Sequence, residues 1–250
     1  MICSLMLNLV IIIDEVIQMN RAERFIVAFN KIEKYFNQEI ADTRYVPFFR
    51  AVLQLKKKNA IVNRYSNDLL EYSELRNAIV HERTELNYTI ADPHIEVVEA
   101  IEQIAEELTA PKLVIPTFRK TLKVIQADLT IKDVLEIIRE TKYTQFPVYR
   151  GKQFSGLLTD KRVLHWLAQR MNGDFSELLK THVSELLDNG KGRSNYRFIP
   201  RSMNIYEAEK IFLETFKKHQ GVDALLITEE GNPTQKLLGM MTPRDLIEIP

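Results

Sequence analysis

Cysteine is almost absent from this chain of 250 residues, and Cys3 is its single example. No disulfide can form within the chain, and no zinc site built on cysteines is possible. Such cysteine usage favours a reducing, cytoplasmic location. The five histidines show no HExxH or other metal-ligand spacing, so we expect no tightly bound metal.

Net charge is also lacking, because 34 Lys and Arg residues balance 34 Asp and Glu residues. A neutral chain has no overall field to draw it to nucleic acid or to a membrane surface, and we expect neither DNA nor a membrane as partner. The distribution is uneven, with 12 basic against 15 acidic residues at 19–110 and 22 against 17 at 111–250. The second part therefore suits a phosphorylated small ligand, whereas the acidic first part argues against RNA binding.

Long apolar runs are missing as well. The opening MICSLMLNLVIII is shorter than the roughly 20 apolar residues that a membrane-spanning helix needs. It has no basic start and no small-residue cleavage site, as a signal peptide would. We expect residues 1–18 to be an apolar extension produced by an over-long start, with a peripheral anchor as the alternative. The chain also lacks P-loop, GxGxxG and GxSxG motifs.

Helical periodicity dominates residues 19–110. Phe25, Phe29, Ile32 and Phe36 recur at steps of three and four, as on the buried face of an amphipathic helix. Further helices are predicted over 47–58 and 60–82 and from Asp92 onward, where Asp92 can act as the N-cap. Four helices with short connections predict an up-and-down bundle. The prolines of PKLVIP end the helical pattern, so we place a domain boundary at 110/111.

An internal repeat follows the boundary. GLLTDKRVL at 156–164 and GMMTPRDLI at 239–247 share a glycine, two apolar residues and a threonine. Each is preceded by a predicted strand and helix, giving two β-α-β-β-α units at 111–180 and 181–250. The fold class is therefore multidomain, α followed by α/β. A cleft between two related halves is a natural ligand site.

The end of the second repeat carries candidate nucleotide-binding residues. Gly239 would allow close backbone approach, Thr242 and the following helix N-terminus could hold a phosphate, and Arg244 could offset its charge. Asp245 could accept hydrogen bonds from a ribose. A purely local interpretation is also open, in which Thr242 caps the helix and Asp245 complements its dipole.

This order of elements, with its repeat and end motif, resembles a tandem pair of CBS domains, regulatory modules named for cystathionine β-synthase. The resemblance covers residues 116–250 and implies that an adenosine nucleotide (AMP, ADP or ATP) binds between the halves. It also implies dimerisation. Carried over, it assigns phosphate contact to Thr242, ribose contact to Asp245, and base contact to Gly221, Val222 and Ala224.

The first repeat departs from the family pattern. Gly156 and Thr159 are present, but Arg162 stands where the second repeat has Asp245. A guanidinium cannot accept hydrogen bonds from a ribose. We therefore expect one complete site per chain, with Arg162 either outside it or reaching a phosphate.

The stretch RNAIVH at 76–81 resembles the motif of HEPN domains, helical bundles that include metal-independent endoribonucleases. Arg76, Asn77 and His81 match its arginine, following polar residue and later histidine. The resemblance covers 20–110 and implies a homodimer in which Arg76 binds the scissile phosphate, Asn77 orients it and His81 moves protons. Chance spacing and a structural histidine near a helix C-terminus explain the same letters.

Two functions remain open at this stage. The first is an endoribonuclease in the helical domain, regulated by an adenosine nucleotide on the CBS pair, with RNA as substrate. The alternative is a non-enzymatic nucleotide sensor whose helical domain only dimerises or docks a partner. A purely structural CBS pair is a third possibility, because one of the two Asp positions is lost.

Overall fold

The computed structural model describes residues 21–40, 45–81, 92–170, 173–188, 194–218 and 221–249. The chain divides into two compact units, Met1–Lys112 and Leu113–Pro250, two residues beyond the boundary that PKLVIP predicts. The expected extension at 1–18 lies outside the described residues. Within the described part, no helix is both long enough and apolar enough to span a bilayer.

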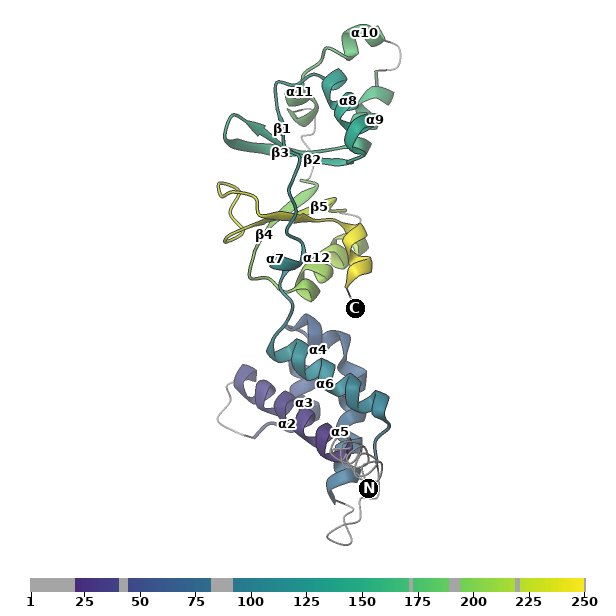
Figure 1. The fold of residues 1–250 in the computed structure, drawn as a ribbon, viewed down its shortest axis with the longest axis vertical. Coiled ribbons are helices and arrows are strands. Elements are labelled where there is room, and N and C mark those ends of the chain that lie inside the picture. The colour runs from purple at the N-terminus through teal and green to yellow at the C-terminus, as the bar shows by residue number, and fades with distance from the viewer. Residues whose placement is uncertain are drawn as a thin grey trace, which may run out of the picture. The chain divides into compact units, whose positions relative to one another are not determined.

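The described part of the first unit is helical throughout. Its elements are α2 (Arg21–Ile40), α3 (Phe48–Leu55), α4 (Ala60–Arg64), α5 (Ser66–His81) and α6 (Ile95–Thr109) (Figure 1). The predicted stripe of α2 is confirmed, since Phe25, Phe29, Ile32 and Phe36 are all buried. The Phe48 ring lies 4.4 Å from the Phe29 ring and 5.2 Å from the Phe36 ring, joining α3 to α2.

An ion pair ties α2 to α6. The Arg24 guanidinium donates from Nε to Glu102 Oε1 at 2.9 Å and from Nη2 to Glu102 Oε2 at 2.6 Å. This two-pronged geometry gives stronger hydrogen bonds than a single contact. It lowers the pKa of Glu102 and raises the pKa of Arg24.

Two local predictions for the helices are wrong in detail. The run predicted as one helix over 60–82 is interrupted at Tyr65, which ends α4 before α5 starts at Ser66. Asp92 does not cap α6: the N-cap is His94, which makes no side-chain cap bond. Asp92 instead lies 3.8 Å from Arg21 Nε in an exposed ion pair.

The second unit contains two three-stranded sheets of the same topology. In each, the outer and central strands run parallel and the central and last strands run antiparallel. This confirms the repeat. The elements of the first repeat are β1 (Ile125–Gln126), α8 (Ile131–Thr141), β2 (Gln145–Arg150), β3 (Gln153–Thr159), α9 (Asp160–Ala168), α10 (Phe175–Leu178) and α11 (Val183–Asp188). Those of the second are β4 (Tyr196–Pro200), α12 (Ile205–Lys217), β5 (Ala224–Thr228), β6 (Gly239–Met241) and the 3-10 helix η1 (Pro243–Glu248).

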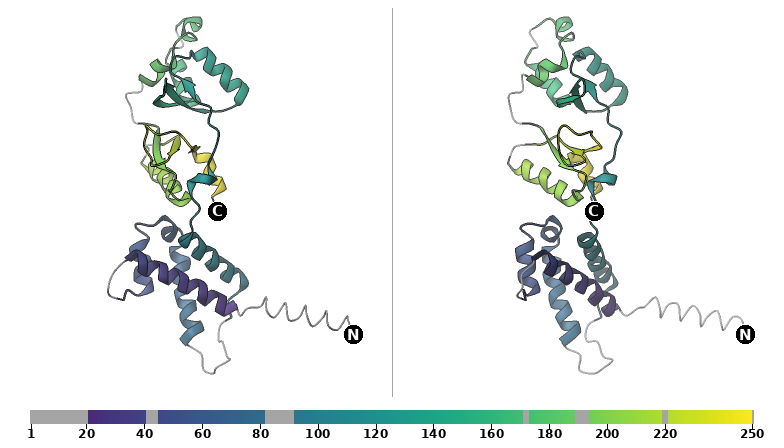
Figure 2. Two further views of the ribbon diagram at one scale, coloured as in Figure 1. Left: turned by 60° about the vertical axis from the view of Figure 1, so that its left-hand side comes forward. Right: turned by 90° about the vertical axis from the view of Figure 1, so that its left-hand side faces the viewer.

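The sheets of the two repeats face each other, and their helices lie on the outer sides (Figures 1 and 2). Leu157 of β3 packs with Ala224 and Leu226 of β5 at this sheet–sheet contact. Phe154 adds edge-to-face contacts to Tyr196 and Phe198, with ring centroids 5.2 and 5.1 Å away. The two repeats therefore share one apolar interface.

The segment that enters the second unit packs against the second repeat before it reaches the first. This segment includes α7 (Val114–Thr117), and Val114 N donates to Met203 O at 2.9 Å. Arg119 forms an antiparallel bridge with Gly239 of β6. The chain then crosses to β1. We name residues 120–124 the crossing segment.

Candidate functional site

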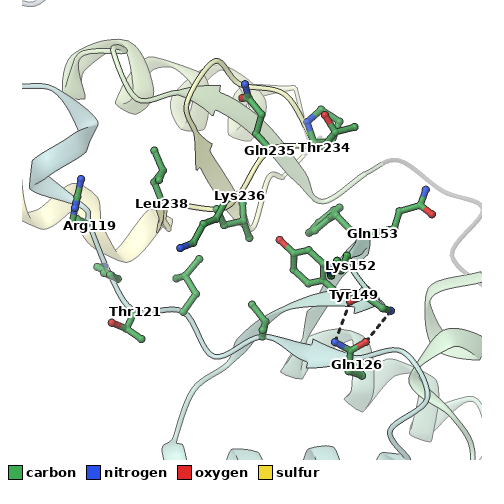
Figure 3. Close-up of a pocket in the computed structure, with 17 residues that line it drawn as sticks. Arg119, Thr121, Gln126, Tyr149, Lys152, Gln153, Thr234, Gln235, Lys236 and Leu238 are labelled. Carbon is green, nitrogen blue, oxygen red and sulfur yellow. Dashed lines mark hydrogen bonds between the residues drawn. The ribbon is translucent and has the colours of Figure 1, made fainter.

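A cavity of about 1270 Å³ lies between the two repeats of the second unit. Its walls come from Arg119 and the crossing segment with the adjoining Gln126, from the β2–β3 turn (149–154), and from the loop before β6 (233–238) (Figure 3). These segments are far apart in sequence. They meet because the chain crosses from the second repeat to the first beside both hairpins.

The charged side chains that line the cavity are all cationic: Arg119, Lys120, Lys152 and Lys236. No aspartate or glutamate is among its lining residues. Lys236 extends from its loop into the opening, toward the wall that Arg119 and Leu238 form (Figure 3). The cavity therefore favours an anionic occupant.

Aromatic and amide groups complete the wall. Tyr149 of β2 turns its hydroxyl into the cavity (Figure 3), and its ring meets Phe154 edge-to-face at 5.6 Å. Burial raises the pKa of Tyr149, so the phenol remains a neutral hydrogen-bond donor at physiological pH. Gln126 Oε1 accepts from Gly151 N at 3.1 Å, which holds the hairpin turn against β1. The walls thus offer an apolar face beside polar and cationic groups.

Asp245 is buried and both of its carboxylate oxygens are bonded. Oδ2 accepts hydrogen bonds from Thr242 N at 2.7 Å and Thr242 Oγ1 at 2.9 Å. These bonds belong to a capping box at the start of η1, with Pro243 in its first turn. The local interpretation of this motif is therefore confirmed.

The second oxygen of Asp245 faces a residue from the other end of the unit. Lys120 Nζ donates to Asp245 Oδ1 at 2.5 Å. Lys120 also lines the cavity, so it links the sequence motif to the cavity wall. The sequence provided no signal for Lys120, because it lies 125 positions from Asp245 in an unpatterned segment.

Gly239 has a structural reason of its own. A Cβ at this position would lie 2.3 Å from the carbonyl oxygen of Phe118. The glycine was predicted to allow close approach to a ligand; in the structure the segment that approaches it is Phe118–Arg119. It therefore holds the entry to the crossing segment against β6.

The remaining residues predicted for the nucleotide do not line the cavity. Arg244 is exposed on η1, Gly221 is exposed before β5, and Val222 and Ala224 are buried. In the first repeat, the buried Thr159 caps α9 by accepting from Arg162 N at 3.2 Å. Nothing in these contacts brings Thr159 or Arg162 together with Asp245.

The RNAIVH stretch occupies the last turns of α5 in the first unit. Arg76 is half-buried, with its guanidinium carbon 6.0 Å from the Phe29 ring centroid, and its Nε is buried without a hydrogen-bond partner. Asn77 is exposed. The backbone of His81 ends α5, and its side chain lies outside the described residues. The structure thus places Arg76 against the aromatic core of the bundle.

Residues that could bind a metal do not cluster in the described ranges: no group of three or more His, Cys, Asp or Glu side chains comes together there. The cationic cavity offers nothing to a metal ion on its own. An occupant with phosphate groups fits its chemistry, because lysine and arginine are the usual phosphate ligands.

Comparison with known proteins assigns a CBS domain to residues 115–169, which match the family model described as CBS domain. That match covers the first repeat. Among solved structures, CBSX2 in complex with AMP is similar at 21% identity over 55% of this chain and 94% of the other, with a TM-score of 0.41. None of the curated proteins matches this chain.

Two further solved structures are similar. The CBS domain pair of protein MJ0100, in complex with 5'-methylthioadenosine and S-adenosyl-L-methionine, shares 13% identity over 56% of this chain and 95% of the other, with a TM-score of 0.41. CbpB in complex with c-di-AMP shares 10% identity over 58% of this chain and 90% of the other, with a TM-score of 0.43.

Proposed function

We propose that the second unit is a CBS-type sensor that binds an adenosine nucleotide in the cavity between its repeats. The observation that carries this proposal is Lys120, which lines a cation-rich cavity and also bonds the aspartate of the CBS-like end motif. The CBS domain at 115–169 supports it. Phosphates would bind the lysine and arginine side chains, and the purine would lie against the Tyr149 and Phe154 wall.

Asp245 provides the ribose contact in this proposal. Its Oδ2 is held by Thr242, whereas Oδ1 bonds only the flexible side chain of Lys120, which is 44% exposed. A ribose hydroxyl could donate to Oδ1 if Lys120 moved aside. This exchange keeps the buried carboxylate hydrogen-bonded throughout, which avoids the large penalty of an unpaired buried charge.

The position of Lys120 suggests how binding could reach the helical unit. Lys120 ends the segment from Leu113 that directly follows the first unit and packs on the second repeat through Val114 and Arg119. A ligand that moves Lys120 acts on this connection. Only a difference in affinity between two arrangements of the segment can turn binding into a signal.

Isothermal titration of the full chain with AMP and with ATP tests the proposal. We expect saturable binding with one site per chain, and at least about tenfold weaker binding by Asp245→Asn, because an amide loses the charge-assisted hydrogen bond. Asp160→Asn is the matched control: Asp160 starts α9, the helix equivalent to η1, and does not line the cavity. If neither nucleotide binds the folded wild type, the proposed function is wrong.

We propose a homodimer as the assembled form. Leu164 on α9 and Ile247 on η1 occupy equivalent repeat positions and are 68% and 86% exposed. Leu213 and Phe216 on α12 add two more exposed apolar side chains. A second copy that covers these helices explains this exposure. Sedimentation of wild type and Ile247→Lys tests it: a dimer that the lysine dissociates is expected, and a monomeric wild type contradicts it.

A second candidate function is RNA cleavage by the first unit. The observation in its favour is that Arg76 keeps a buried Nε without a partner, beside the exposed Asn77 on the same turn of α5. Packing on Phe29 explains Arg76 without catalysis, so the adaptor function ranks first. Cleavage of a labelled tRNA pool in EDTA, with wild type and His81→Ala and with or without ATP, distinguishes the two. Loss of cleavage in the variant would establish a nuclease, and an inert wild type would exclude it under these conditions.

A further inference from the structure

We infer that the cavity selects a nucleotide with two or more phosphates over a monophosphate, a nucleoside or a cationic adenosine compound. This inference rests on the proposed function and names the ligand class for that site. It follows from the charges that surround the cavity and from the bond that Lys120 must break when a ligand takes Asp245.

The cavity presents more positive charge than a monophosphate can neutralise. Of its four cations, Lys120 alone makes an ion pair among the described residues, and Arg119, Lys152 and Lys236 make none there. A terminal phosphate carries a charge of about −2 at neutral pH, and each further phosphate adds about −1. A triphosphate therefore matches the four cations, whereas a monophosphate leaves about two of them without an anion.

The cations come from three separate segments, which spreads them along the cavity wall. Arg119 and Lys120 lie at the crossing segment, Lys152 at the β2–β3 turn, and Lys236 in the loop before β6 (Figure 3). One compact phosphate cannot contact all three segments. A chain of phosphates can follow the wall, and the volume of about 1270 Å³ exceeds the roughly 300–1000 Å³ of ordinary small-ligand sites.

The exchange at Asp245 adds to this selectivity. A ribose hydroxyl that takes Asp245 Oδ1 displaces the Lys120 ammonium from its bond of 2.5 Å. Adenosine offers that ammonium no anion in return, and S-adenosylmethionine brings a positive charge of its own. A phosphate chain restores an anionic partner to Lys120 inside the cavity. Each added phosphate is therefore expected to strengthen binding by roughly fivefold, the value of one partly exposed ion pair.

Isothermal titration with adenosine, AMP, ADP, ATP and inorganic tripolyphosphate, each in EDTA, tests the inference on the full chain. We expect affinity to rise in that nucleotide order, with ATP at least about tenfold tighter than AMP. Lys152→Gln and Lys236→Gln are each expected to weaken ATP by roughly fivefold and AMP by less than twofold. Lys132→Gln removes an exposed lysine on α8 that does not line the cavity, and should change neither affinity.

The outcomes separate this inference from the proposed function. Equal affinities for AMP and ATP, unchanged by both lysine variants, would overturn the inference and leave the nucleotide sensor standing. Absence of binding by every adenosine compound would overturn both. Tripolyphosphate that binds as tightly as ATP would support the cation site and contradict an adenosine-specific sensor. Thermal unfolding of each variant, followed by the fluorescence of Trp166, verifies that it is folded.

Discussion

Gly239→Ala is the sharpest test of how the second unit is built. The new methyl group would lie 2.3 Å from Phe118 O, 3.2 Å from Phe118 C and 3.3 Å from Ile115 Cδ1, where ordinary contacts begin near 3.4 Å. The first two of these neighbours are backbone atoms, so the segment or β6 must move by roughly 1 Å to accept the methyl group. Overpacking of this kind costs typically about 1–3 kcal/mol, and a backbone neighbour that cannot rotate away places this case at about 2–3 kcal/mol.

Urea and thermal unfolding monitored by Trp166 fluorescence measure this cost. Trp166 is the only tryptophan and is buried in the core of the first repeat, so its signal reports the second unit. A loss of about 2–3 kcal/mol lowers the Tm by roughly 6–10 °C for a unit of this size. Gly221→Ala is the matched control, since no heavy atom lies within 4 Å of its added Cβ. If Gly239→Ala unfolds within about 0.5 kcal/mol of wild type, the close approach of Phe118 to β6 is refuted.

Two further predictions concern the first unit. Asn59→Ala should lose about 1–2 kcal/mol, because Asn59 Oδ1 caps α4 through Ile61 N at 2.9 Å and Val62 N at 3.1 Å; urea unfolding by far-ultraviolet circular dichroism measures it, and an unchanged midpoint would contradict it. Glu102→Gln should destabilise the unit at about pH 7 and much less at about pH 3. The Arg24 bond lowers the pKa of Glu102, so its stabilisation is complete above the ordinary carboxyl pKa and is lost as the pH falls through the lowered value. Melting curves of both proteins at the two pH values test this, and an equal difference at both would count against it.

Periodicity predicted the elements well because it records burial. The buried stripe of α2 and the repeated strand–helix order both follow from apolar spacing, and both are present. The same signal failed at Tyr65, since Ile61, Tyr65 and Leu69 continue the helical spacing across the break between α4 and α5. Spacing does not record where backbone hydrogen bonds stop.

The site was only partly predictable for a related reason. Thr242 and Asp245 are three residues apart, and their local bonds follow from that spacing. Lys120 and Phe118 meet the same motif only because the chain packs on the second repeat before crossing to the first. A contact between residues so distant in sequence depends on the complete fold, and one chain read alone carries no pattern for it.

A crystal structure of the full chain with ATP bound tests the central claim most directly. We predict ATP between the repeats, with its ribose on Asp245, Lys120 moved from Asp245 to the phosphates, and Lys236 in contact with the phosphate chain. A structure in which ATP binds elsewhere and the bond between Lys120 and Asp245 stays intact would contradict the account.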